Sequence, residues 1–340
     1  MKAAVLKSPG HVVVQDVPDP VIGEYDVLCE TLAAAVCSGT DNHIVRDHPY
    51  FKVSFPCIIG HEGIGRVINC GKSVKYFKEG DLITRVFNKL PEGSGYSLQY
   101  GAFAEKSTAA DWQAMRDDGI PEENWCKYRV HRALPVGSDP VESTMIITWR
   151  ETFSFLKRMK VEIGNSLLII GSGTTALSFA NHARNIGMKT SAIGSPSRAQ
   201  LFYKMGVKII IAYFEKNYSA LLEEMRRDKF DVIIDTIGDS EYLNLALPLL
   251  KDGGKVGLYG LDSFLDYRIA ATSAPGDFIY YNGEFYDEAS AHDDIIEYLK
   301  TGRLNAWDYI SKNHIYPLEK ISEALDAGYT RKVLKSVVIF

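Results

Sequence analysis

Two different hydrophobic patterns divide the chain. From residue 2 to about residue 147, short β-branched or alternating apolar runs are separated by Gly, Pro and Asp turns. Such runs are typical of strands. Helical spacing is scarce before Ser143, so this part is predicted to be mostly β, with strands at 2–6, 12–17, 26–35 and 65–69.

From residue 148 to about residue 285, short apolar runs alternate with segments that have helical spacing. This alternation predicts βαβ units, and therefore a doubly wound parallel sheet in an α/β fold. The expected strands are 167–170, 190–193, 209–211, 232–235, 255–260 and 278–281.

The last part of the chain predicts two helices, at 293–301 and 318–327, and a closing strand at 333–339. A strand after the α/β part indicates that the chain returns to its first domain. A chain of 340 residues also exceeds one ordinary core. We therefore expect one domain from 1–147 with 286–340, and a second domain from 148–285.

A glycine-rich turn follows the first strand of the α/β part. The apolar run 166–170 leads into Gly171-Ser-Gly173-Thr174-Thr175-Ala176, and a helical pattern follows. In a dinucleotide-binding turn the first glycine permits the tight turn, the second lets the pyrophosphate approach, and the helix N-terminus faces the phosphates. Because strand, turn and helix occur together, we expect Gly171, Gly173, Thr174 and Thr175 to bind a nicotinamide cofactor.

The end of the second strand of this unit indicates which cofactor binds. An NAD site has Asp or Glu there, but no acidic residue occurs between Gly171 and Phe214. The strand runs instead into Gly194-Ser195-Pro-Ser197-Arg198, whose hydroxyl groups and guanidinium suit a 2′-phosphate. We therefore expect NADP(H), the alternative being a surface turn with an incidental arginine.

Composition excludes several function classes. The chain is 46% hydrophobic and 24% charged with a net charge of −5, which disfavours nucleic-acid or anionic-membrane binding. No apolar run reaches transmembrane length, and the N-terminus lacks a signal-peptide layout. The five cysteines form no CxxC pair and are typical of reduced thiols, so we expect a cytoplasmic protein.

Two short stretches of the first domain carry metal-ligand chemistry. Cys37 lies in Cys-Ser-Gly-Thr-Asp, and His61 and Glu62 lie in Gly-His-Glu-Gly. Thiolate, imidazole and carboxylate are the donors that a catalytic zinc uses. Zinc lowers the pKa of an alcohol and so favours hydride loss at neutral pH. Each residue alone has an ordinary packing role, but beside a nicotinamide domain the set indicates zinc.

The sequence resembles the medium-chain dehydrogenase/reductase superfamily, and within it the zinc-containing alcohol and polyol dehydrogenases. The resemblance extends over the whole chain and combines two specific motifs, GHExxGxV and GxGxxA. The matching segments are CSGTD at 37–41, GHEGIGRV at 60–67, GD at 80–81, GSGTTA at 171–176, FDVIID at 230–235 and KSVV at 335–338.

The resemblance implies a GroES-like catalytic domain interrupted by a Rossmann domain, with the active site in the cleft between them. Cys37 and His61 would be zinc ligands, and Glu62 a third ligand or an exchangeable carboxylate. Asp41 would hydrogen-bond to the His61 ring. Thr40 or Ser38 would pass the alcohol proton toward solvent through His43.

Three departures from the family pattern bear on the metal. One extra residue stands between Cys37 and Asp41, so a gapless alignment places Ser38 at the ligand position. Ile147 occupies the position of a further ligand, and Glu151, four residues later on the same helix face, is the candidate that replaces it. No cysteine lies between Arg85 and Glu105, so we expect no structural zinc.

Other polar and aromatic residues have weaker claims. The segment 109–132 is expected to be a solvated surface excursion, the alternative being a lid with Trp112 and Trp125 over the substrate. Asn88, Trp149 and the stretch 280–282 are candidates for lining the cleft.

Three functions remain open from the sequence. The first is an NADP(H)-dependent, zinc-assisted dehydrogenase of an alcohol, polyol or sugar. The second is a zinc-free NADPH-dependent quinone or enoyl reductase of the same superfamily, and the third is a non-catalytic NADPH-binding protein. Relatives of this type form dimers or tetramers, and the strand 277–281 is a candidate joining edge.

Overall fold

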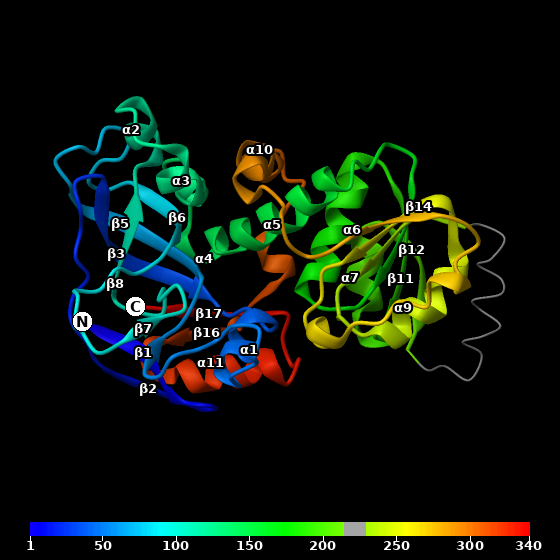
Figure 1. Ribbon diagram of the computed structural model, residues 1–340, viewed down its shortest axis with the longest axis horizontal. Helices are drawn as coiled ribbons and strands as arrows, with labels where there is room; N and C mark the ends of the chain where they lie inside the picture. Colours follow the sequence, from blue (N-terminus) through cyan, green and yellow to red (C-terminus); the bar gives the residue numbers. More distant parts are fainter. Residues whose placement is uncertain (214–228) are drawn as a thin grey trace. The chain divides into compact units, whose positions relative to one another are not determined.

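The structure is a computed structural model that describes residues 1–213 and 229–340 (Figure 1). Its contacts divide the chain into two compact units. Unit 1 contains Met1–Thr148 and Asn305–Phe340, and unit 2 contains Trp149–Leu304. The C-terminal segment therefore returns to the unit in which the chain begins.

Unit 1 is built on two sheets. The first has the order β2-β1-β4-β7, and the second has the order β16-β17-β3-β5-β6-β9 with β8 paired to β3. Every N-terminal strand expected from the sequence is present. The bounds are β1 Lys2–Ser8, β2 His11–Asp16, β3 Asp26–Ala35, β4 Cys57–Ile58, β5 Glu62–Cys70, β6 Leu82–Val86, β7 Ser97–Leu98, β8 Lys106–Ala110, β9 Arg132–Ala133, β16 Ile310–Pro317 and β17 Lys335–Ile339.

The part before Ser143 is mostly β, as expected, but it also contains short helices that the sequence did not indicate. Unit 1 contains α1 (Thr40–Val45), α2 (Trp112–Asp117) and α3 (Glu122–Trp125), followed by α4 (Pro140–Ser143). The first three helices have four to six residues, too few for a 3.6-residue apolar period to show in the sequence. A local hydrogen bond defines the start of α2, where the Asp111 side chain accepts from Ala114 N at 3.0 Å.

The segment 109–132 is only partly a solvated excursion. Asp111 is fully buried, and its carboxylate also accepts from the backbone N–H groups of Lys75 and Tyr76 at 2.8 Å. The rings of Trp112 and Trp125 stack on each other with their centroids 5.9 Å apart. The middle of the segment is exposed, but both ends are anchored to unit 1.

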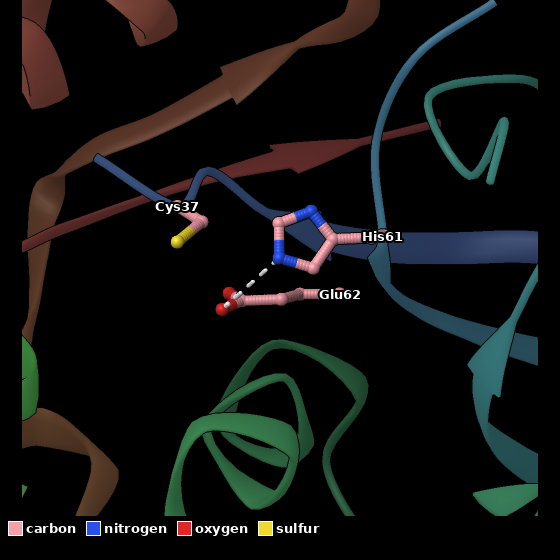
Figure 2. A group of neighbouring side chains, drawn as sticks. All are labelled: Cys37, His61 and Glu62. Atoms are coloured by element: carbon pink, nitrogen blue, oxygen red, sulfur yellow. Dashed lines mark ion pairs between the residues drawn. The ribbon is translucent and has the colours of Figure 1, made fainter. Parts of the chain in front are cut away.

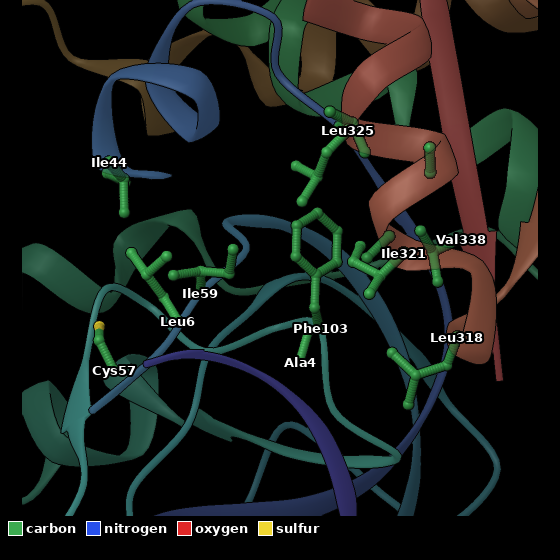
Figure 3. Packing of buried hydrophobic residues seen from close by; sticks show 13 residues of the cluster. Ala4, Leu6, Ile44, Cys57, Ile59, Phe103, Leu318, Ile321, Leu325 and Val338 are labelled. Atoms are coloured by element: carbon green, nitrogen blue, oxygen red, sulfur yellow. The ribbon is translucent and has the colours of Figure 1, made fainter. Parts of the chain in front are cut away.

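The core of unit 1 joins the two ends of the chain. Phe103 is fully buried and lies among Ala4 and Leu6 of β1, Ile59, and residues of α11 (Ile321–Tyr329) (Figure 3). Leu318, just before α11, and Val338 of β17 also belong to the cluster. This packing explains why the closing helix and strand belong to the unit in which the chain begins.

Unit 2 is a parallel sheet with helices between its strands. The order is β12-β11-β10-β13-β14-β15, and every pairing is parallel. This confirms the α/β class and the doubly wound sheet. The strands are β10 Ser166–Ile170, β11 Lys189–Gly194, β12 Val207–Ala212, β13 Phe230–Asp235, β14 Leu250–Leu258 and β15 Phe278–Tyr281; the helices include α5 Met145–Arg158, α6 Thr174–Ile186, α7 Ala199–Lys204, α9 Ser240–Ala246 and α10 His292–Lys300.

The compact units differ from the expected domains at Thr148, which clusters with unit 1, and at residues 286–304, which cluster with unit 2. The second difference is the larger one. The physical reason is a set of polar contacts to α5. Buried Arg150 places Nη2 2.5 Å from Glu288 Oε1, and Lys157 Nζ lies 3.0 Å from Asp294 Oδ2. The first ion pair holds the turn Glu288–Ala291 against α5, and the second holds α10 against it.

Candidate metal centre and nucleotide-binding turn

Three donor side chains meet in unit 1. Cys37 follows β3, while His61 precedes Glu62 at the start of β5, so the antiparallel pairing of β3 with β5 brings them together. One ligand atom from each of Cys37, His61 and Glu62 lies within 4.8 Å of the other two (Figure 2). His61 Nε2 and Glu62 Oε1 are 3.9 Å apart. This is the donor set on which the sequence argument for zinc depends.

Asp41 connects two of the three donors. Its Oδ1 lies 3.0 Å from His61 Nδ1, which confirms the contact that the resemblance implied. Its Oδ2 accepts from the backbone N–H of Cys37 at 2.8 Å. Burial alone would lower the pKa of His61, but the Asp41 carboxylate and Cys37 raise this pKa well above its ordinary value.

Glu62 has a buried cationic partner that the sequence argument missed. Lys335 Nζ on β17 lies 2.5 Å from Glu62 Oε2, and neither side chain is more than 3% exposed. Thr148 Oγ1 links the pair, since it donates to Glu62 Oε1 at 3.1 Å and accepts from Lys335 Nζ at 3.1 Å. The only sequence signal for this contact is a lysine within an apolar closing strand.

The extra residue before Asp41 does not remove Cys37 from the group, because its sulfur still lies beside His61 and Glu62. Ile147 is fully buried on α5. Glu151 lies further along α5 in unit 2, and its place in a ligand shell stays a prediction.

Two candidates for proton transfer, Thr40 and His43, lie on α1, where His43 Nδ1 is 2.7 Å from Gly39 O. In that contact the Nδ1–H of His43 points to the backbone carbonyl, and Nε2 is the ring nitrogen that does not take part in it.

The further candidates for lining a cleft have different roles. Asn88 is buried, and its Nδ2 donates to the carbonyl oxygens of Gly101 and Lys106 at 3.2 and 3.0 Å. Trp149 is fully buried on α5. Asn282 accepts from Arg158 through both its carbonyl oxygen and its side chain. Tyr280 on β15 is 42% exposed.

The glycine-rich turn of unit 2 has the shape of a phosphate cradle. Gly171 has φ +128°, and a Cβ there would lie 1.9 Å from Thr236 Oγ1, so only glycine fits. Around Gly173 a Cβ would meet nothing within 4 Å, so this face of the turn is open. Gly173 precedes α6, which begins at Thr174 and carries no side-chain hydrogen bond at its N-cap. The N–H groups of this helix end therefore suit a pyrophosphate.

The end of β11 carries the residues expected at a 2′-phosphate. Gly194 is the last residue of the strand, and the short helical turn Pro196–Arg198 follows. Ser195 Oγ and Ser197 Oγ are 2.8 Å apart and exposed. Arg198 is half-buried at the end of this turn. The structure thus groups two hydroxyl groups and a guanidinium in one short segment.

Comparison with known proteins agrees with this arrangement. The alcohol dehydrogenase GroES-like domain family matches residues 23–121, and the zinc-binding dehydrogenase family matches residues 171–274, together more than half of the chain. D-arabinitol dehydrogenase 1 of Uromyces fabae is 24% identical over 94% of this chain and 91% of its own length. Sorbitol dehydrogenase of Bacillus subtilis (strain 168) is 25% identical over 99% and 97%.

A solved structure shows the same fold over the full length. Galactitol-1-phosphate dehydrogenase from Escherichia coli superimposes with a TM-score of 0.80 at 19% identity, covering 100% of both chains. Within the described residues, no helix is both long and apolar enough to cross a membrane. The two family matches, which together cover more than half of the chain, show that it belongs to the medium-chain dehydrogenase/reductase superfamily, as a member of its zinc-containing alcohol and polyol dehydrogenases.

Proposed function

We propose that this protein is an NADP(H)-dependent, zinc-assisted oxidoreductase that interconverts a hydroxyl group of an alcohol, polyol or sugar with a ketone or aldehyde. The observation that carries the proposal is the Cys37, His61 and Glu62 group, whose donor atoms lie within 4.8 Å of one another. A thiolate, an imidazole and a carboxylate form the kind of set that holds a catalytic zinc and leaves a position for a further ligand.

The residues present fit a zinc ion. His61 directs Nδ1 toward Asp41, so its Nε2 is the nitrogen left for a metal. Cys37 and His61 would hold the ion. Glu62 would bind it or exchange with water, because its carboxylate is also held by Lys335 and Thr148. Glu151 is the proposed replacement for the ligand that Ile147 cannot supply.

When bound, zinc would act as a Lewis acid on the alcohol while the nicotinamide carries the hydride. The protein's own residues orient the proposed zinc ligands and neutralise a buried charge beside them. Asp41 fixes the His61 ring and the Cys37 backbone together. Lys335 offsets the buried charge of Glu62. Ser38 or Thr40 would take the alcohol proton and pass it to His43, whose ring is held by Gly39 O.

The proposed cofactor is NADP(H). The Gly171–Gly173 turn and the start of α6, including Thr174 and Thr175, would bind the pyrophosphate. Ser195, Ser197 and Arg198, beyond Gly194, would bind the 2′-phosphate. The proposal includes one catalytic zinc per chain and no structural zinc.

A zinc-free NADPH-dependent reductase is the second candidate function, and Ile147 together with the extra residue after Cys37 favours it.

The proposed assembly is a dimer or tetramer joined at β15, because β15 is an edge strand on which Ile279 is 52% exposed. The partners are otherwise small molecules.

The test is a set of initial rates on zinc-loaded protein. Wild type, Arg198→Ala and Arg66→Ala, an exposed arginine of β5 used as a matched control, are assayed with NADP⁺ and with NAD⁺ against polyols, sugars and simple alcohols. We expect NADP⁺-dependent oxidation that falls about 10-fold or more in Arg198→Ala, with NAD⁺ rates unchanged. Tight NADPH binding without turnover on any alcohol, aldehyde or activated alkene would contradict the proposal and favour a binding protein.

A further inference from the structure

One residue with a strained backbone contacts the candidate metal centre, and a second such residue contacts the first. Arg85 has φ +65° and Tyr100 has φ +67°, a region that non-glycine residues seldom adopt. Strained backbone of this kind is retained where the surrounding structure holds it in place, and it is concentrated at binding and catalytic sites. Both residues belong to unit 1, as do Cys37, His61 and Glu62.

The Tyr100 ring lies against the imidazole of His61. Their ring centroids are 5.5 Å apart, with an angle of 47° between the planes. The Tyr100 side chain is nevertheless 46% exposed, whereas His61 is 3% exposed. Within the part of the chain that the structure describes, no hydrogen bond engages the Tyr100 hydroxyl group. An amphipathic ring therefore stands open beside a proposed zinc ligand.

A buried side chain holds Tyr100 in this position. The backbone N–H of Asn88 donates to Tyr100 O at 2.7 Å, and Asn88 Nδ2 donates to Gly101 O at 3.2 Å. Gly101 has φ +87°, and a Cβ there would lie 2.8 Å from Asn88 Cβ. Asn88 is 2% exposed, so its amide is fixed and the turn at Tyr100 is fixed with it. Asn88 is therefore a positioning residue for this turn.

Arg85 reaches the same ring from a bulge in β6. Opposite β6, Gly63 pairs with Val86 and the next residue, Ile64, pairs with Thr84, so Arg85 is an extra residue in the ladder. A bulge re-aims the side chain that it carries. The Arg85 guanidinium carbon lies 5.9 Å from the centroid of the Tyr100 ring, within the range of a cation–π contact.

We propose that Tyr100 is the specificity-determining residue that selects substrates with more than one hydroxyl group. Its ring packs against the carbon face of the substrate, and its hydroxyl group hydrogen-bonds to a substrate hydroxyl near the reacting carbon. Arg85 and Asn88 position the ring. The inference rests on the proposed function, because it places the reacting hydroxyl at the Cys37, His61 and Glu62 group.

The test compares two substrates that differ by one hydroxyl group. The ratio of kcat/KM for butane-2,3-diol to that for butan-2-ol is measured with NADP⁺ on zinc-loaded protein. Tyr100→Phe keeps the ring and removes the hydroxyl group, so we expect this ratio to fall about 10-fold. Tyr76→Phe is the matched control, because Tyr76 is 47% exposed and its hydroxyl group contacts Asp117 on the surface. We expect it to keep the wild-type ratio.

A binding measurement separates this inference from the proposed function. We expect xylitol to raise the Tm of zinc- and NADP⁺-loaded wild type more than that of Tyr100→Phe. If neither butan-2-ol nor butane-2,3-diol is oxidised but the xylitol shift depends on Tyr100, the polyol-binding role of Tyr100 stands and the proposed oxidation fails. If oxidation is normal but the Tyr100→Phe ratio and shift match wild type, the inference is overturned, as it is if wild type shows no diol preference and no shift.

The role of Arg85 is tested by Arg85→Met and Arg85→Lys. The methionine removes the cation, so we expect part of the diol preference to be lost through KM with kcat unchanged. We expect lysine to restore that preference in part, because it keeps the cation over the ring. An equal loss of kcat on both substrates in Arg85→Met, without rescue by lysine, would show a general structural role and overturn the positioning assignment.

Discussion

One carboxylate, that of Asp41, hydrogen-bonds at the same time to His61 Nδ1 and to the backbone N–H of Cys37. The two contacts are 3.0 and 2.8 Å long, and Asp41 is fully buried. The Asp41 side chain on α1 therefore fixes both the ring orientation of His61 and the backbone position of Cys37. The extra residue between Cys37 and Asp41 therefore does not separate the Asp41 carboxylate from the Cys37 backbone.

Asp41→Ala should weaken zinc binding. Groups that orient a ligand typically contribute 10- to 100-fold to metal affinity, so we expect a loss in that range. The measurement is competition with a chromophoric chelator at fixed pH. Asp16→Ala, an exposed aspartate at the end of β2, serves as the control and should bind zinc as wild type does. Wild-type affinity in Asp41→Ala would show that the hydrogen bond does not support the metal centre.

Lys335→Met should destabilise the metal-free protein through Glu62. The ion pair is at most 3% exposed, and removing one partner leaves a buried charge without its cation. Such a change costs about 3–5 kcal/mol in free energy of unfolding. In a Glu62→Gln background the same change should cost much less, because no charge is left to compensate. Urea denaturation of the four proteins in chelator measures this coupling, and equal costs in both backgrounds would refute it.

The sheets and the glycine turn were predictable because their signals are local. Alternating or buried apolar runs define β1, β3 and β10, and the positions of Gly171 and Gly173 relative to strand and helix define the turn. The three short helices α1 to α3 were not predictable, because a segment of four to six residues is too short to display a helical period.

The candidate site was predictable only in its donors. Cys37, His61 and Glu62 are recognisable by residue type and motif, but Lys335 joins them only because β17 pairs with β3, with Val337 opposite Ala35. Tyr100 likewise reaches His61 through a turn that depends on the burial of Asn88. Contacts that depend on strand pairing or on a buried amide join residues that are far apart in the sequence. No local motif or spacing predicts them.

Gly173→Ala and Gly171→Ala should separate nucleotide binding from folding. Gly173 has φ −84°, and an added Cβ would meet no protein atom, so we expect the alanine variant to keep its Tm. Its methyl group would occupy the open face where the pyrophosphate approaches, so NADPH affinity should fall about 10-fold or more. Gly171→Ala should lower the Tm itself, because of its φ and the clash with Thr236. Fluorescence titration and thermal melts measure both, and unchanged NADPH affinity in Gly173→Ala would place the cofactor elsewhere.

Asp235 should make stability depend on pH. Burial raises the pKa of this carboxyl to about 6, although Tyr267 and the N–H groups of Gly238 and Ile237 donate to it. The pKa of an aspartate carboxyl in an unfolded chain is about 3.9. Between that pH and about pH 6, Asp235 therefore holds its proton more often in the folded protein than in the unfolded chain. The free energy of unfolding contributed by this group therefore falls as pH rises from about 4 to 6, by roughly 3 kcal/mol.

Asp235→Asn removes this titration and should lose that part of the pH dependence. We measure the Tm of wild type minus the Tm of the variant from pH 4.5 to pH 7. This difference should decrease as pH rises, because only wild type loses stability through Asp235. A difference that stays constant over this range would mean that the folded and unfolded pKa values of Asp235 are equal.

We propose above all that Cys37, His61 and Glu62 hold one catalytic zinc. Elemental analysis of gently purified protein, with wild type beside Cys37→Ala, tests it most directly. We predict about one zinc per chain in wild type and loss of that zinc in the variant. Absence of metal in wild type after zinc is supplied would contradict the claim and favour the zinc-free reductase. Two zinc ions per chain would contradict the expectation that the structural site is missing.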